Sequence, residues 1–196
     1  MDLAKLMARV QRLLMSPATE WDAIAGEPAD TQAIYMNHVG PLILAAALAG
    51  AIGMSLVGVM GFRIGLGSAL TQLVLNVVFG LVGVYVFGLI INALAPQFGG
   101  TSDMGQAFKV AAYSPTAAWV AQLVLIIPAL SILALLGAVY SLYLLYVGLP
   151  KLMKPAPDKA MIYTLAVIGA MIVIGIVIAA VSSAFMPAMT PMLRTY

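Results

Sequence analysis

The sequence predicts an all-α fold, an integral membrane bundle of five transmembrane helices behind a short amphipathic N-terminal helical segment. Three observations predict this fold. The chain is 63% hydrophobic and 8% charged, whereas about 25% of residues are charged in soluble proteins. Its apolar residues gather in five runs, each of about the 20 residues that a helix needs to cross a bilayer. Lysine and arginine cluster in alternate breaks between the runs, as in multi-pass membrane proteins.

The apolar runs set the domain organisation. Residues 1–38 are expected to form cytoplasmic amphipathic or interfacial helices, 39–186 the membrane domain, and 187–196 a short external tail. The predicted spans are residues 41–61, 69–95, 108–127, 129–150 and 160–185. A chain of 196 residues leaves no room for a second domain.

The distribution of positive charge predicts the orientation of the bundle. With a cytoplasmic N-terminus, five spans place seven basic residues inside and two outside, which favours an N-in, C-out arrangement. The inside residues are Lys5, Arg9, Arg12, Lys109, Lys151, Lys154 and Lys159, and the outside residues are Arg63 and Arg194. A single span over 108–150 would reverse this bias, so Pro128 is predicted to form the turn of a tight outer hairpin.

Composition also excludes several classes of function. Without cysteine there is no disulfide or thiolate site, and the single His38 cannot build a metal centre, so no metal or cofactor is expected. His38 is interpreted as an interfacial side chain. The basic residues lie beside apolar runs, which argues against nucleic-acid binding. The spans contain no charged pair or nucleophile with a base, so the chain is predicted not to be an enzyme.

The N-terminal segment predicts two short helices. Apolar residues recur at helical spacing opposite Lys5, Arg9 and Arg12. These apolar residues are Leu3, Leu6, Met7, Val10, Leu13 and Leu14. Such a helix can lie among anionic lipid headgroups, or it can pack on the cytoplasmic end of its own bundle. Ser16 and Pro17 fit the start of a second helix that ends at Gly26, with Trp21 as an interfacial anchor.

Polar residues inside the predicted spans have two possible roles. Gln72 and Asn76 lie on one face of the second span, and Gln122 lies in the third. Side chains of this type join helices by hydrogen bonds. The alternative is that they line a hydrated path for ions, small solutes or lipid headgroups.

The loop after the fourth span is exposed, basic and stiffened by proline. Lys151, Lys154 and Lys159 follow a run of tyrosines that includes Tyr146, which is typical of an aromatic and cationic belt at the membrane surface. Lipid anchoring is one interpretation of this loop, and docking of a protein partner is the other.

Three stretches, taken in order, resemble the Yip family, the Ypt-interacting five-span membrane proteins, and in particular its short bacterial inner-membrane branch. They are residues 13–21 (LLMSPATEW), 99–115 (GGTSDMGQAFKVAAYSP) and 143–150 (YLLYVGLP). The residues of these stretches taken as the family-like motif are Ser16, Pro17, Tyr113, Ser114, Pro115, Tyr146 and Gly148.

The resemblance implies a helical bundle with a cytoplasmic N-terminus. Eukaryotic relatives are associated with Rab-type GTPases through a longer N-terminal region that carries an acidic-Leu-Tyr-Gly-Pro type of motif. This chain has instead only the fragment from His38 to Pro41, so the resemblance does not extend to Rab binding.

These observations together predict a non-enzymatic, multi-pass protein of the bacterial inner membrane. It is expected to organise the membrane or recruit a membrane or cytoplasmic protein partner at its cytoplasmic face, and its other candidate partners are the lipid bilayer, anionic headgroups and a second copy of the chain. The proposed contact residues are Lys5, Arg9, Arg12, Trp21, Lys151, Lys154 and Lys159. The alternative is a homo-oligomeric channel or transporter that uses Gln72, Asn76 and Gln122.

Overall fold

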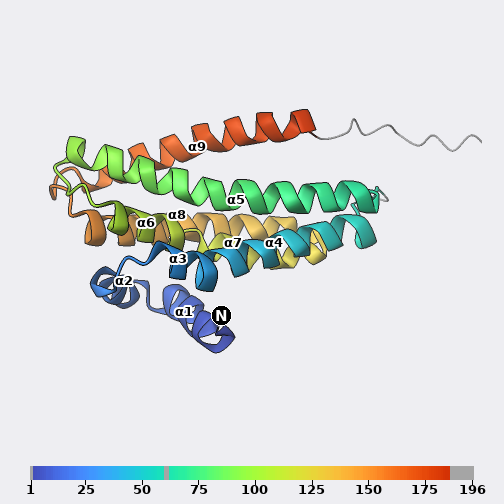
Figure 1. Cartoon of the computed structure of the whole chain (residues 1–196), viewed down its shortest axis with the longest axis horizontal. Helices are drawn as coiled ribbons and strands as arrows, with labels where there is room; N and C mark the ends of the chain where they lie inside the picture. The colour runs from blue at the N-terminus through green and yellow to red at the C-terminus, as the bar shows by residue number, and fades with distance from the viewer. Residues whose placement is uncertain (1, 60–61, 186–196) are drawn as a thin grey trace, which may run out of the picture.

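The chain folds into an elongated all-α bundle, with most helices running along one long axis (Figure 1). The computed structural model describes residues 2–59 and 62–185. The predicted external tail over 187–196, with Arg194, lies outside the described residues, as does Gly61 at the end of the first predicted span.

Four helices are long and apolar enough to cross a membrane, judged by length and composition. They cover Thr31–Val57, Leu66–Phe98, Pro128–Met153 and Ala160–Val181. The first combines α3 (Thr31–Ile34), the π-helical η1 (Tyr35–Val39), α4 (Gly40–Ile52) and the π-helical η2 (Gly53–Val57). The others are α5 (Leu66–Leu94) with η3 (Ala95–Phe98), the short η5 (Pro128–Leu130) with α8 (Ser131–Met153), and α9 (Ala160–Phe185).

The segment between α5 and α8 is divided. The sequence predicts one helix over 108–127, and the structure instead has α6 (Met104–Tyr113), α7 (Thr116–Gln122) and a 3₁₀ turn, η4 (Leu123–Ile126). Helix α6 packs on α5 and α8, and α7 packs on α8 and α4. The chain then reverses at Pro128, the first residue of η5, and α8 returns beside α7.

The break between α6 and α7 has a local cause. Pro115 has no N–H to donate, and its ring clashes with the carbonyl four residues earlier, so it interrupts a helix. The hydroxyls on either side bind nearby backbone carbonyls: Ser114 Oγ donates to Val110 O, and Thr116 Oγ1 donates to Tyr113 O, both at 2.7 Å. Periodicity alone does not reveal such a break, because both halves are apolar.

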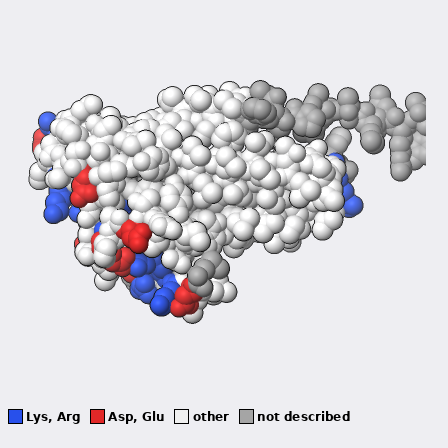
Figure 2. Space-filling model, in the orientation of Figure 1, with Lys and Arg blue, Asp and Glu red and all other residues white. Residues whose placement is uncertain are grey.

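The connections between helices meet at two ends of the bundle. At one, which we call the charged end, residues 99–103 join residues 153–156 through Thr101 N to Met153 O (2.8 Å) and Ala156 N to Phe98 O (3.0 Å). At the opposite end, η2 contacts η4 and η5. Residues 104–126 therefore run from the charged end to the opposite end. Acidic and basic side chains gather at the charged end and over the N-terminal helices on the face shown in Figure 2.

Close backbone contacts at two glycines join helices in the half of the bundle toward the opposite end. A Cβ on Gly53 would overlap the carbonyl of Leu125 in η4, and a Cβ on Gly137 would overlap Ala117 and Ala121 of α7. Backbones that approach this closely require small residues, as is common between membrane helices.

The hydrophobic core lies toward the charged end. Its fully or nearly fully buried members include Trp21, Ile24, Phe87, Ile91, Phe108, Leu145, Leu149, Met153 and Tyr163. Farther along the bundle the apolar side chains are largely exposed. The buried side chains of α9, Tyr163 and Val167, lie near the beginning of that helix. Exposed apolar surface on spanning helices is stable in contact with lipid.

Candidate functional site

The N-terminal helices pack on the bundle near its charged end (Figure 1). Helix α1 (Leu3–Met15) buries Leu6 and Leu13, and α2 (Pro17–Gly26) packs on α8. Asp2 begins α1 by accepting from Ala4 N (3.1 Å) and Lys5 N (3.2 Å), as an N-cap does.

The second helix begins where the sequence predicts. Pro17 occupies the first turn of α2, and Ser16 precedes it at the cap position, although the Ser16 side chain makes no capping hydrogen bond. Helix α2 ends at Gly26. The N-terminal segment packs on its own bundle, while Leu3 and Met7 stay exposed on the outer side of α1. A position of this helix among lipid headgroups stays a prediction.

Arg9 is the centre of an ion-pair cluster that joins α1, α2 and α6. Its guanidinium lies 3.0 Å from Glu20 and 2.6 Å from Glu27, and 5.5 Å from the centre of the Tyr113 ring. Arg12 also binds Glu20, at 2.6 Å. The Glu20 side chain is only 5% exposed, so its charge depends on these two arginines. Burial opposes the charge of Arg9, but its bond to Glu27 and the nearby negative charges raise the pKa of Arg9 overall.

Lys109 closes the C-terminal end of α2. Its residue is 1% exposed, and its ammonium donates to Ile24 O at 2.9 Å and to Glu27 O. Gln106, one turn earlier on α6, donates to Ala25 O at 3.2 Å. The last carbonyls of a helix have no partner within the helix, and a cation placed there satisfies them and the helix dipole.

Trp21, in the first of the three family-like stretches, contacts residues of the other two. Its ring lies so close to Gly148 of α8 that a Cβ there would overlap the indole, and it meets Tyr113 edge-on at 6.4 Å. Ser114 and Pro115 form the break that follows Tyr113, whereas Tyr146 is 53% exposed. Trp21 itself is fully buried, so in this structure it contacts protein rather than the membrane surface.

His38 is buried among protein side chains, and its predicted position at the level of the membrane interface stays a prediction. It is 4% exposed, its ring centre lies 4.6 Å from that of Tyr113, and its Nε2 lies 2.9 Å from Thr116 Oγ1. Because Thr116 already donates its one hydroxyl proton to Tyr113 O, His38 Nε2 must donate to Thr116. Sequence reasoning missed this partner because 78 residues separate the pair.

The basic loop after α8 divides into bound and exposed residues. Lys151 binds Asp22 (2.6 Å) and Ala18 O (2.8 Å), which ties α8 to α2. Lys154 ends α8 in a left-handed conformation with φ of 48°, and Lys154 and Lys159 are exposed.

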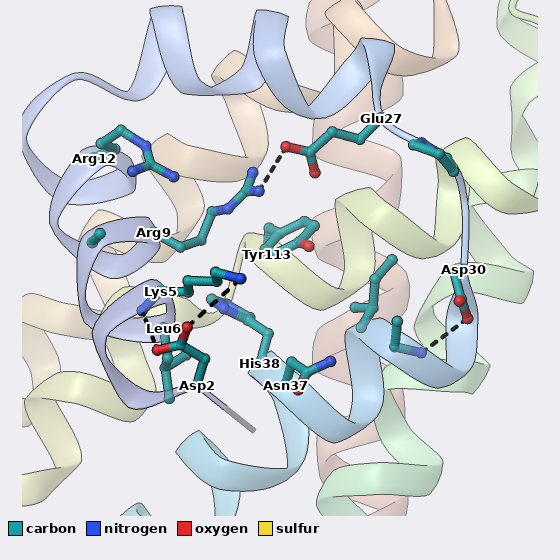
Figure 3. A pocket seen from close by; sticks show the side chains of 14 residues that line it. Asp2, Lys5, Leu6, Arg9, Arg12, Glu27, Asp30, Asn37, His38 and Tyr113 are labelled. Atoms are coloured by element: carbon teal, nitrogen blue, oxygen red, sulfur yellow. Dashed lines mark hydrogen bonds and ion pairs between the residues drawn. The ribbon is translucent and has the colours of Figure 1, made fainter.

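A cavity of about 840 Å³ lies between α1, the connection over residues 27–30 and the start of the first long helix (Figure 3). Tyr113 and His38 contribute to its inner wall, together with Asn37. Its charged lining residues are Asp2, Lys5, Arg9, Arg12, Glu27 and Asp30.

The structure does not bring the three intramembrane amides together. Asn76 is exposed on α5, Gln72 and Gln122 are half-buried on α5 and α7, and α4 packs against both helices. None of the three lines the cavity under α1. A smaller cavity of about 120 Å³, between Phe87, Pro115 and Met171, also lacks them. Among the described residues there is no group of three or more metal-ligating His, Asp or Glu side chains.

Sequence reasoning missed the partners of the basic residues. Glu20 and Glu27 follow the basic helix within one short segment, and this pairing of charge was the available signal for an internal cluster. The burial of Lys109 carried no such signal, because its acceptors are backbone carbonyls.

Comparison with known proteins identifies the family. No curated protein and no solved structure matches the chain. The Yip1 domain matches residues 12–179, a range that covers α2, all four long apolar helices except the last residues of the fourth, and the α6–α7 segment. The chain is therefore a multi-pass helical membrane protein that belongs to the Yip1 domain family.

Proposed function

We propose that this protein is a five-span protein of a bacterial inner membrane, oriented N-in and C-out, that organises the membrane or recruits protein partners at its cytoplasmic face. Proteins of its family are generally non-enzymatic membrane proteins. The fifth span in this proposal is the α6–α7 segment, which runs between the two ends of the bundle although it is broken at Pro115.

The observation that carries the proposal is the grouping of charge at one end. Helix α1 packs on α2 there, and α2 packs on α8, whose Lys151 donates to Ala18 O just before the loop that carries Lys154 and Lys159. Arg63 lies in the connection after η2 at the opposite end. Positive charge concentrates on the cytoplasmic side of membrane proteins. The charged end is accordingly assigned to the cytoplasm.

The proposed contact residues have two roles. Arg9, Arg12, Trp21 and Lys151 hold the N-terminal helices on the bundle through the contacts described above. Lys5, Lys154 and Lys159 are exposed and present positive charge to a lipid headgroup or an acidic protein surface. The proposed recruiting surface thus consists of the three exposed lysines, and the first four residues hold the helices next to it in place.

Site-specific crosslinking tests this surface. A photo-crosslinking residue at the exposed Pro157, between Lys154 and Lys159, is expected to capture a defined protein in intact cells. The adduct should disappear in the Lys154→Gln, Lys159→Gln double variant at unchanged protein level. The same probe at Phe62, which is 73% exposed at the opposite end, is the control. Identical adducts at both positions, or adducts that survive removal of the lysines, would contradict recruitment by this loop.

A further inference from the structure

The cavity under α1 is lined by charges of both signs. Lys5, Arg9 and Arg12 line it from α1, together with Asp2 at the start of that helix, while Glu27 and Asp30 line it from the connection across the cavity (Figure 3). The lining thus contains three acidic and three basic side chains, of which Lys5 pairs with Asp2 and Arg9 with Glu27. A site for a simple anion or a simple cation would carry an excess of one sign, whereas a balanced lining fits a ligand that carries both charges.

Part of this charge is available to a ligand. Arg9 is engaged by Glu20 and Glu27, but Lys5 has an 87% exposed side chain, and its one ion pair among the described residues is with Asp2, at 3.6 Å. Arg12 is half-exposed and uses Nε for Glu20. On the other wall, Asp30 uses one carboxylate oxygen to cap α3, accepting from Ala33 N at 2.9 Å. Phosphate is well matched to a lysine beside an arginine, and a carboxylate suits an ammonium group.

Size and position agree with this ligand chemistry. A volume of about 840 Å³ lies within the range of small-ligand pockets, about 300–1,000 Å³. Asn37 and His38, which line the cavity, belong to the first turns of the first long apolar helix, Thr31–Val57. The beginning of a spanning helix lies at the level of lipid headgroups.

We propose that this cavity binds a zwitterionic phosphoethanolamine group, with its phosphate on Lys5 and Arg12 and its ammonium on Asp30. The group comes either from a phospholipid headgroup or from a free small molecule. The site itself does not depend on the proposed recruiting function, and only the lipid source rests on the proposed assignment of the charged end to the cytoplasmic side of the membrane.

Calorimetric titration of the full-length protein in detergent tests the site. Phosphoethanolamine should bind saturably and about tenfold or more tightly than inorganic phosphate or ethanolamine alone. Lys5→Gln and Asp30→Asn should each weaken it about tenfold, which corresponds to the loss of one charge-assisted hydrogen bond. Asp30→Asn keeps the α3 cap because asparagine is an equally good capping residue. Arg63→Gln, at the opposite end of the bundle, is the matched control and should leave binding unchanged.

The remaining outcomes separate the alternatives. Equal binding of inorganic phosphate, with no loss in Asp30→Asn, would overturn the proposal in favour of a plain anion site, and the absence of saturable binding would overturn it outright. Native mass spectrometry from nanodiscs of mixed phosphatidylethanolamine and phosphatidylglycerol then identifies the source. Retention of phosphatidylethanolamine supports a lipid ligand, binding of the soluble group without lipid retention supports a free one, and preferential retention of phosphatidylglycerol overturns the proposal.

Discussion

Arg9 holds three parts of the chain together through one guanidinium group. It bridges Glu20 and Glu27 and lies over the ring of Tyr113, so α1, the end of α2 and α6 share a single charged contact. Replacing both members of a buried ion pair with apolar residues is often nearly neutral, whereas removing one member leaves an uncompensated charge. Losing Arg9 therefore leaves Glu27 without its ion-pair partner and leaves the buried Glu20 with Arg12 alone.

Arg9→Met should weaken the attachment of α1 to the bundle by about 3 kcal/mol, in the range for breaking a buried pair. Amide hydrogen exchange in α1, measured by mass spectrometry on protein in detergent, reports this local opening directly. Arg12→Met is the comparison. It removes the other partner of Glu20 from a half-exposed position, and because Arg9 still pairs with both Glu20 and Glu27, the loss should be smaller. Adding Glu20→Gln to Arg9→Met should recover most of the loss. Equal exchange in the two single variants would contradict this role of Arg9.

Lys109 stabilises α2 by a different mechanism, through backbone carbonyls. Lys109→Met should leave Glu27 O without its donor and Ile24 O with the Glu27 N–H alone, at a cost of about 1–3 kcal/mol for a buried group. Exchange should rise first in the last turn of α2. Lys151→Met removes a lysine that binds the same helix at the surface, through Asp22, which is 68% exposed, and should change exchange much less. If hydrogen exchange in α2 changes equally in the two variants, the contact of Lys109 with the end of α2 is not the source of the stability of that helix.

Between helices, the docking of α2 onto α8 depends on the absence of a side chain at Gly148. The Trp21 indole occupies the position that a Cβ would need. Helix α2 therefore lies close against α8, and Lys151 completes the contact one turn further along through Asp22.

Gly148→Ala should displace Trp21 and detach α2, at a cost of about 1–3 kcal/mol for overpacking. Limited proteolysis in the connection over residues 27–30 should accelerate while the long helices stay protected. Gly169→Ala in α9, where a Cβ meets nothing within 4 Å, should leave the rate unchanged, since alanine favours a helix over glycine. Unchanged proteolysis in Gly148→Ala would show that Trp21 does not hold α2 in place.

The sequence predicts the long apolar helices well, because length and hydropathy alone distinguish segments that cross a bilayer. It does not predict the break at Pro115, where a proline and two hydroxyls rearrange the backbone within an apolar run. The sequence also does not predict the partners of Arg9, His38 and Lys109. Their partners lie far away in the chain, and a basic residue near a predicted headgroup region looks the same whether it faces lipid or a buried glutamate.

At the scale of the whole molecule, two sets of groups share the charged end. In one set, Glu20, Lys109 and Trp21 are buried, and together with the part-buried Arg9 they fix the N-terminal helices to the bundle. The other set is exposed, with Lys5 at the cavity and Lys154 and Lys159 on the loop. This division separates the residues expected to control stability from those expected to control binding. Variants of the second set should change ligand or partner association while leaving exchange in α1 and α2 unchanged.

Cysteine labelling in intact cells tests most directly whether this charged end is the cytoplasmic end of a bundle that the chain crosses five times. The chain contains no cysteine, so single variants can be labelled without background by a membrane-impermeant maleimide. Arg63→Cys and Ala129→Cys, at exposed positions of the opposite end, should react in intact cells, whereas Lys159→Cys should react only after the membrane is permeabilised. A protected Ala129→Cys together with a freely reactive Lys159→Cys would mean that the α6–α7 segment does not cross, and it would contradict the five-span arrangement.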